Sequence, residues 1–186
     1  MKRTIVTVSA LALAAGLAWA AARAQEGFQM PKPQKEHEFL KHFEGTWEAT
    51  TKFRMAADQP WMESKGSETN TLIGGFWLVS DSKGEMFGQP FRGFGTTGYD
   101  PYKKKYVSTW VDSMGPCLSI GEGTVDATGK IMSVQVNSTD CATGKPCTMR
   151  MTQEIKDKDT TTWSMYMPGA DGKEFQCMTG ESKRKK

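Results

Sequence analysis

Apolar and polar residues alternate with a period of two along most of the chain, which is the pattern of a half-buried β-strand. The alternation is clear in residues 46–55, where Trp47, Ala49, Phe53 and Met55 take odd positions between charged residues and threonines. Together with similar runs, this pattern predicts roughly ten strands. The other runs lie at about 62–72, 75–82, 91–99, 105–113, 116–125, 131–139, 147–155, 160–167 and 174–182.

Turn-forming residues separate these runs. Examples are Gly74-Gly75, Asp100-Pro101 and the Pro-Gly-Ala-Asp-Gly stretch at 168–172. The gaps leave no room for crossover helices, so each strand should pair in an antiparallel manner with the next one. Because closure removes exposed strand edges, we predict an all-β antiparallel meander that closes into a barrel.

One short helix is predicted before the first strand. In residues 36–44, three apolar residues fall on one helical face, namely Phe39, Leu40 and Phe43. Gly45 then ends the segment. No later segment keeps a helical period for long, so this helix should be an accessory to the barrel.

The beginning of the chain has the composition of a secretory signal. Residues 1–24 contain two basic residues, then an apolar run rich in Val, Leu and Ala, then small residues suited to cleavage after Ala24. We therefore expect a signal peptide over 1–24, a flexible lead-in over 25–36 and one barrel domain over 37–186. The expected location is outside the cytoplasm, in the bacterial periplasm, with no stable membrane anchor.

Removal of this segment would change the charge of the protein. The full chain has 24 Lys and Arg against 21 Asp and Glu, and three of the basic residues, Lys2, Arg3 and Arg23, precede the cleavage point. The remaining 162 residues would carry 21 charges of each sign. This balance excludes nucleic-acid binding as an interpretation based on composition.

Four cysteines in an exported chain are disulfide candidates before they are metal ligands. A hairpin turn between Cys141 and Cys147 brings these two close together, so we predict a bridge between them. The partners of Cys117 and Cys177 stay open. No spacing resembles C-x-x-C and the chain has only 2 histidines, so no metal site is expected.

Two motifs have alternative interpretations. Residues 93–98 read G-x-G-x-x-G, but a strand rather than a helix follows, so we expect bend or space-making glycines and no dinucleotide cofactor. Methionine pairs at 149/151 and 165/167 could hold Cu(I), but an adaptable apolar lining is the more ordinary use of methionine.

The first strand opens with a motif found in a known group of barrels. Residues 43–47 (Phe-Glu-Gly-Thr-Trp) resemble the start of lipocalin-like, calycin-type folds. In those folds a basic residue near the chain end lies over the tryptophan ring. The resemblance implies a structural cation–π contact between Trp47 and Arg184.

A longer resemblance covers about residues 36–186. The segment 98–114 (GYDPYKKKYVSTWVDSM), together with 167–175 and 183–185, looks like the bacterial family called domain of unknown function 1579. This resemblance implies a secreted barrel-like fold and no agreed activity.

Aromatic and polar residues on the predicted strands are the candidate ligand contacts. In residues 105–113, Tyr106, Trp110 and Asp112 share one face, but either face could point inward, and Asp112 could instead cap the following turn. Arg150 could equally be a solvated or salt-bridged residue. The residues that we expect to contact a ligand are Trp77, Tyr99, Tyr106, Trp110, Asp112, Arg150 and Trp163.

These features favour a barrel that binds a small apolar or amphipathic molecule. No G-x-S-x-G motif is present and the two histidines precede the barrel, so we assign no catalytic residue. An enzyme that uses strand-borne carboxylates such as Asp112 remains the alternative, and an envelope protein-interaction module is a third possibility. The oligomeric state stays open.

Overall fold

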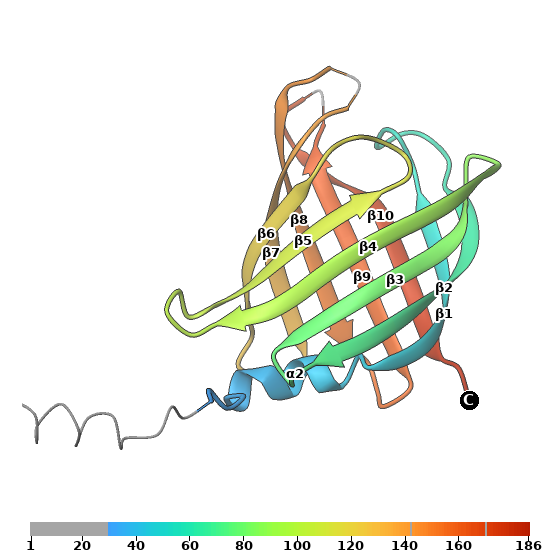
Figure 1. The fold of residues 1–186 in the computed structure, drawn as a ribbon. Helices are drawn as coiled ribbons and strands as arrows, with labels where there is room; N and C mark the ends of the chain where they lie inside the picture. Colours follow the sequence, from blue (N-terminus) through green and yellow to red (C-terminus); the bar gives the residue numbers. More distant parts are fainter. Residues whose placement is uncertain (1–29, 142, 170) are drawn as a thin grey trace, which may run out of the picture. The chain divides into compact units, whose positions relative to one another are not determined.

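The computed structural model describes residues 30–141, 143–169 and 171–186, and the signal peptide expected at 1–24 lies outside these residues. Within the described part, ten antiparallel strands follow one another around a closed barrel, and β10 pairs with β1 (Figure 1). This confirms the predicted fold. The strands are β1 Gly45–Phe53, β2 Met62–Ile73, β3 Trp77–Met86, β4 Gln89–Asp100, β5 Lys105–Asp112, β6 Ser119–Val125, β7 Ile131–Thr139, β8 Pro146–Ile155, β9 Thr160–Pro168 and β10 Glu174–Arg184.

The helical segment before β1 consists of a 3-10 turn, η1 (Lys35–His37), and one turn of α-helix, α2 (Glu38–Lys41). It lies across one end of the barrel (Figure 1). Among the described residues, no helix is long and apolar enough to cross a bilayer.

Strand register identifies the inner face of the barrel. Residues that pair across neighbouring strands face the same side of the sheet, and successive residues alternate between sides. On β7, Met132, Val134 and Val136 are buried, whereas the intervening residues are exposed. The buried set therefore faces inward, and its pairing partners on the other strands do so as well.

The end beneath the helical segment is filled. We call residues 35–43 the plug, because its apolar side chains Phe39, Leu40 and Phe43 are buried together with inward residues of β3, β5 and β7. Aromatic contacts connect the plug to the wall, since the Phe39 and Tyr106 ring centroids are 5.7 Å apart. The other members of this core are Leu78, Tyr106, Met132, Val134 and Val136.

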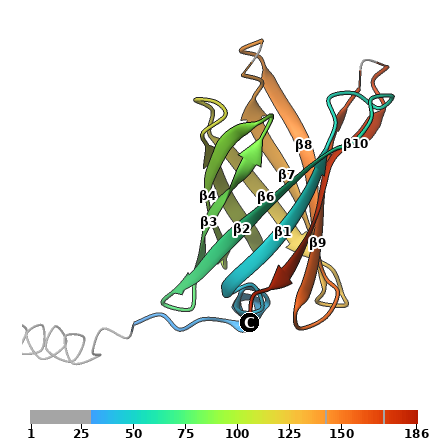
Figure 2. The ribbon, with the colours of Figure 1, turned by 90° about the vertical axis from the view of Figure 1, so that its right-hand side faces the viewer.

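The opposite half of the barrel is less filled. Its inward residues are only half-buried, although they face the interior; Phe91, Trp110, Met167 and Met178 are examples. Solvent therefore reaches the inner face of this part, which we call the open half. Figure 2 shows β3 and β4 on one side of the barrel and β8, β9 and β10 on the other.

The predicted Cys141–Cys147 disulfide is wrong. Cys141 is bonded to Cys117, with Cα atoms 6.5 Å apart, and Cys147 and Cys177 are free. Cys147 pairs in register with Ser138, which continues the inward set of β7, so its thiol belongs to the interior. Cys141 lies beyond the end of β7, where it meets the loop between β5 and β6. The bridge therefore connects two loops at the open end.

Candidate functional site: the inner face of the open half

An apolar wall forms one side of the open half. Met151, Met165 and Met178 pair in register across β8, β9 and β10, so the three thioethers form a row on the inner face. Met149 and Met167 extend the wall toward the open end. All five methionines are half-buried. Flexible, polarisable side chains of this kind can adapt to apolar ligands of different shapes.

Trp163 belongs to the same wall. It pairs with Gly180 of β10, and a Cβ atom at Gly180 would overlap the indole ring. The indole therefore packs against the backbone of β10 at Gly180, and Trp163 remains half-buried. The wall thus combines thioethers with an aromatic face.

Small and polar residues form the facing wall on β2, β3 and β4. Ser82 of β3 pairs with Glu68 of β2 and with Gly93 of β4, and the next inward pair in the row above is Gly66 with Gly84. Toward the open end the same strands carry the inward Met62, Met86 and Phe91. The middle of this wall therefore has short polar side chains, and its end near the opening is apolar.

Trp110 covers the glycines of β4. A Cβ atom at Gly95 would lie 2.9 Å from the Trp110 ring, and one at Gly93 would overlap it. Both glycines face inward, so their role in the G-x-G-x-x-G segment is to make room for this indole. The third glycine, Gly98, faces outward and makes room for Trp77 in the same way.

Asp112 holds the Trp110 ring in place. The indole Nε1 donates a hydrogen bond to Asp112 Oδ2 at 2.9 Å, and the backbone N–H of Met114 donates to Oδ1 at 2.9 Å. Asp112 therefore caps the turn after β5 and also faces the interior. Oδ1 thus has the turn-capping role that the sequence allowed for Asp112, and Oδ2 binds the inward indole of Trp110.

Glu68 is the second inward carboxylate, and sequence reasoning missed it. Its Oε1 accepts a hydrogen bond from Asn70 Nδ2 and its Oε2 accepts one from the Ser82 hydroxyl, both at 2.8 Å. Asn70 also donates to the carbonyl oxygen of Phe43 at 3.1 Å, which connects the plug to this wall. The pairing of β1 with β2 could have identified Glu68 as an inward residue, because it is the register partner of the inward Trp47.

The structure brings only some of the predicted contact residues together. Trp110, Asp112 and Trp163 lie on the inner face of the open half, as described above. Tyr99 and Tyr106 also face inward, but they belong to the filled end, where their ring centroids are 5.2 Å apart. The Tyr106 hydroxyl donates to the Glu36 carbonyl oxygen at 2.6 Å, and burial raises the pKa of Tyr106 to about 12.

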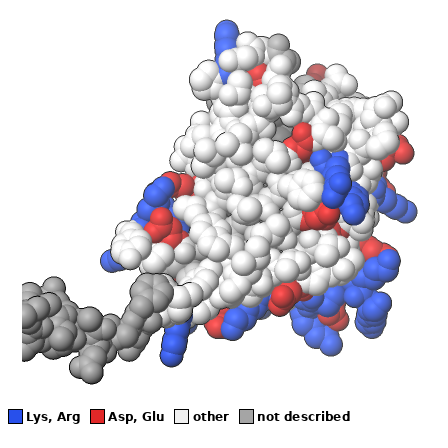
Figure 3. All heavy atoms as spheres, viewed as in Figure 1, with Lys and Arg blue, Asp and Glu red and all other residues white. Residues whose placement is uncertain are grey.

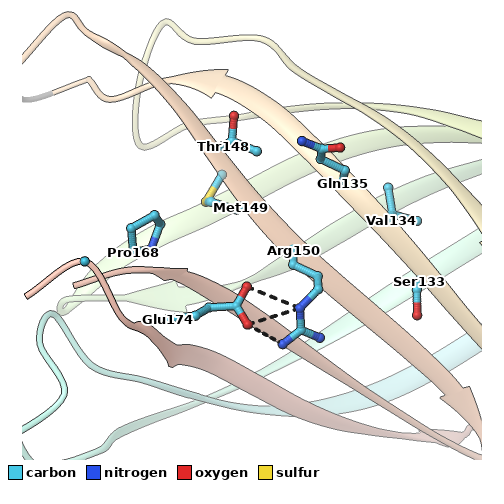
Figure 4. A pocket seen from close by; sticks show the side chains of 9 residues that line it. Ser133, Val134, Gln135, Thr148, Met149, Arg150, Pro168 and Glu174 are labelled. Atoms are coloured by element: carbon cyan, nitrogen blue, oxygen red, sulfur yellow. Dashed lines mark hydrogen bonds and ion pairs between the residues drawn. The ribbon is translucent and has the colours of Figure 1, made fainter.

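Trp77 and Arg150 lie on the outer face. Arg150 Nε donates to Glu174 Oε2 at 3.1 Å (Figure 4). The guanidinium stacks over the Tyr166 ring at 3.9 Å. The pair borders a pocket of about 460 Å³ where β8 and β9 separate, because their ladder ends at Arg150 and Tyr166. Arg150 is thus bound to a carboxylate on the outer face, and the pocket beside it also contacts the inward residues Val134 and Met149.

Trp47 and Arg184 close the filled end. The Arg184 guanidinium lies 4.2 Å from the centre of the Trp47 ring and donates hydrogen bonds of 2.6 Å to the carbonyl oxygens of His42 and Glu44. The Trp47 Nε1 donates to the Phe43 carbonyl oxygen at 2.8 Å. The last strand, the first strand and the plug are therefore tied together at this point.

His42, beside this contact, is poorly solvated. Its Nε2 is buried without a hydrogen-bond partner in the described part of the chain. Burial and, secondarily, the nearby Arg184 charge lower the pKa of His42. This histidine is a neutral structural residue at neutral pH, far from the open half.

These features define a class of protein: an antiparallel ten-stranded barrel with one plugged end and an interior that solvent reaches from the other. The model of the family described as "Protein of unknown function (DUF1579)" matches residues 32–184, and the chain belongs to this family. No curated protein matches the sequence.

Two solved structures share the fold. Rv2717c from M. tuberculosis aligns with a TM-score of 0.63 and 13% sequence identity, over 82% of this chain and 99% of that chain. The S-type phycobiliprotein lyase CPES from Guillardia theta aligns with a TM-score of 0.56 and 13% identity, over 83% of this chain and 99% of that chain. At these identities the likeness shows the architecture.

Proposed function

We propose that this protein binds a small apolar or amphipathic molecule inside the open half of its barrel. The observation that carries the proposal is the half-buried state of Met151, Met165, Met178 and Trp163, which face inward yet remain in contact with solvent. Apolar area left wet in a barrel interior is stabilised when a ligand covers it, by roughly 25 cal/mol per Å². The barrel shared with a phycobiliprotein lyase supports the same use of the fold.

A titration with N-phenyl-1-naphthylamine, a neutral fluorescent probe, tests the proposal. We expect saturable binding of one probe per barrel, with energy transfer from tryptophan. Met165→Gln puts an amide on the inner wall and should weaken binding about tenfold, because an unpaired buried amide costs about 1–3 kcal/mol. Thr162→Gln, on the outer face of the same strand, is the matched control. Equal affinity of both variants, or no saturable binding by the wild type, would refute the proposal.

We also propose that the mature protein is exported, to the bacterial periplasm, after cleavage near Ala24. The composition of residues 1–24 supports this, and so does the Cys117–Cys141 disulfide, because such bonds persist in oxidising compartments. Cell fractionation with mass spectrometry of the intact protein tests it. A cytoplasmic protein that still carries residues 1–24 would contradict it.

An interaction module is the second candidate function, and the outer surface favours it. Trp77, Phe94, Val111 and Ile120 are 41–50% exposed on β3 to β6, and Figure 3 shows a broad face with few charges in the same view as Figure 1. The occupant we propose is a second copy of the chain, since the charges at its edge are already paired, as in Arg92 with Asp81. Val111→Lys should abolish any dimer seen by light scattering; a monomeric wild type at high concentration would exclude this candidate.

The enzyme alternative rests on Asp112. In the described residues its two oxygens accept hydrogen bonds from an indole and a backbone amide, which position a ring and a turn. This arrangement gives a ligand-lining role more direct support than an acid–base role.

A further inference from the structure

We infer that the ligand of the open half is an amphipathic cation, whose protonated amine is attracted by the negative charges of Glu68 and Asp112. This inference rests on the proposed function and adds the chemical class of the ligand. It follows from the charges on the inner face, the position of Trp110 and an unpaired acceptor on Asn70.

The inner face carries uncompensated negative charge. Among the inward strand residues that the structure describes, Glu68 and Asp112 are the acids and Arg184 is the base. Arg184 is held at the filled end by carbonyl oxygens and the Trp47 ring. Among the described inward strand residues, Glu68 and Asp112 therefore have no basic side chain within ion-pair distance.

Several acids on the outer face are ion-paired. Asp81 lies 3.2 Å from Arg92, Glu122 lies 2.5 Å from Lys103, and Glu174 lies 2.5 Å from Arg150. In contrast, the hydrogen-bond donors to Glu68 and Asp112 are neutral, and neither acid forms an ion pair within the described residues. A cation bound in the open half would neutralise the inner carboxylates.

The two carboxylates lie on one row of the sheet. Glu68, Ser82, Gly93 and Asp112 are successive register partners on β2, β3, β4 and β5. Three strand spacings of about 4.8 Å separate the two ends, or about 14 Å. The Trp110 ring covers β4 between them. An aromatic face with carboxylates beside it is the arrangement that attracts organic cations, because the π-face and the acids are all negative.

Asn70 provides an independent indication that the missing group carries N–H donors. The side chain is 3% exposed, and its Nδ2 hydrogens are used by Glu68 and the Phe43 carbonyl. Its Oδ1 is buried with no hydrogen-bond partner among the described residues. An unpaired buried acceptor costs about 1–3 kcal/mol, so an N–H donor that reached Asn70 Oδ1 would be stabilising. An ammonium group with N–H bonds can donate to this acceptor, whereas a quaternary ammonium group has no N–H bond to donate.

The opposite wall indicates that the remainder of the ligand is apolar. The methionine row and Trp163 belong to β8, β9 and β10. These strands lie across the barrel from β3 and β4, which form the middle of the carboxylate row (Figure 2). A molecule that spans the interior meets anionic groups on one side and thioethers on the other. A primary amine on a hydrocarbon body fits both sides.

Three probes with the same ten-carbon chain separate head-group from chain recognition: decylammonium, decanol and decanoate, each added below its micelle concentration at pH 7. Calorimetry should show decylammonium binding about tenfold more tightly than decanol, with decanoate the weakest, as for a cation near an aromatic face and two acids. Decyltrimethylammonium should bind less tightly than decylammonium, because it offers no N–H group to Asn70. Added salt should reduce the differences in affinity between the charged probes and decanol.

Glu68→Gln and Asp112→Asn should each reduce the preference for decylammonium over decanol about threefold to fivefold and leave decanol affinity nearly unchanged. Glu48→Gln, which removes an equal charge from the exposed face of β1, is the control and should leave the preference intact. Decanol binding as tight as decylammonium, or tighter decanoate binding, would overturn this inference but leave the proposed function standing. Absence of binding by all four probes would overturn both.

Discussion

Tyr106 offers a quantitative test of how the plug is attached to the barrel wall. Its side chain is 5% exposed, and its hydroxyl donates to the Glu36 carbonyl oxygen at 2.6 Å. Tyr106→Phe removes this bond and leaves a carbonyl without its donor. We expect the variant to be less stable than the wild type at pH 8 by about 1 kcal/mol, the usual contribution of such a bond.

The pH dependence provides a second, independent signal. Burial, with a smaller contribution from the charge of Glu36, raises the pKa of Tyr106 from 10.0 to about 12 in the folded state. Below pH 10 the phenol is protonated in both states, so its contribution is fully present. Above pH 10 only the unfolded chain ionises, and stability is lost as the pH rises toward 12. With about 1.4 kcal/mol per pKa unit, the loss is roughly 1.4 kcal/mol at pH 11.

The two effects oppose each other, so the advantage of the wild type over Tyr106→Phe should shrink from about 1 kcal/mol at pH 8 to about zero at pH 11. Urea unfolding followed by tryptophan fluorescence at pH 8, 10, 10.5 and 11 measures this difference. Ionisation of the other groups cancels, since both proteins carry them. Tyr102→Phe is the control, because Tyr102 is 97% exposed. A wild-type advantage that stays constant to pH 11 would refute the reasoning.

Three further substitutions test other parts of the structure. Arg184→Lys loses the double donation to the carbonyl oxygens of His42 and Glu44 and should cost about 1–2 kcal/mol in urea unfolding, since bonds to charged groups contribute about 1.5–3 kcal/mol when intact; an unchanged midpoint would contradict this. Gly95→Ala places a methyl group 2.9 Å from the Trp110 ring, so near-ultraviolet circular dichroism should change and stability should fall by about 1–3 kcal/mol. Cys117→Ser should cost about 3 kcal/mol, as for other loops of similar length, and dithiothreitol should destabilise the wild type but not this variant. Cys147→Ser, which removes a free thiol, should retain the response to dithiothreitol.

The strands were predictable because most of them have one buried face and one solvent-exposed face. The run at 131–139 matches β7 residue for residue, and 105–113 exceeds β5 by one position. Local alternation and turn residues contain this information, and a chain of short antiparallel strands leaves barrel closure as the way to cover the edges. The calycin-like opening at residues 43–47 pointed to the same architecture.

The direction in which β5 faces was not predictable, because both of its faces are partly apolar. Val107 and Val111 lie on the outer side, where Val111 is 44% exposed, while Tyr106 and Trp110 point inward. When the outer face is also apolar, the sequence lacks the polar–apolar contrast that distinguishes the inner face of a strand from the outer one. Trp77, which was also among the expected ligand contacts, covers Gly98 on the exterior.

The cysteine pairing failed because hairpin register describes only neighbouring strands. Cys141 and Cys147 flank one turn, but Cys147 continues the inward face of β8 while Cys141 lies outside the ladder. Its partner Cys117 comes from the loop between β5 and β6, two strands away. The path of a loop in space depends on barrel curvature, and local alternation contains no information on it.

The distribution of burial separates the part of the barrel that makes it stable from the part that we propose binds ligand. The largest fully buried side chains, Trp47 and Leu40, both lie at the filled end, and the core cluster is centred on the plug. The inward residues of the open half contribute less to folding, because solvent already reaches them. These side chains can therefore be replaced without loss of the fold, since substitution of a solvent-accessible side chain changes the free energy of unfolding little. On this argument Met165→Gln should alter ligand affinity at nearly constant stability, whereas substitutions at the plug should do the reverse.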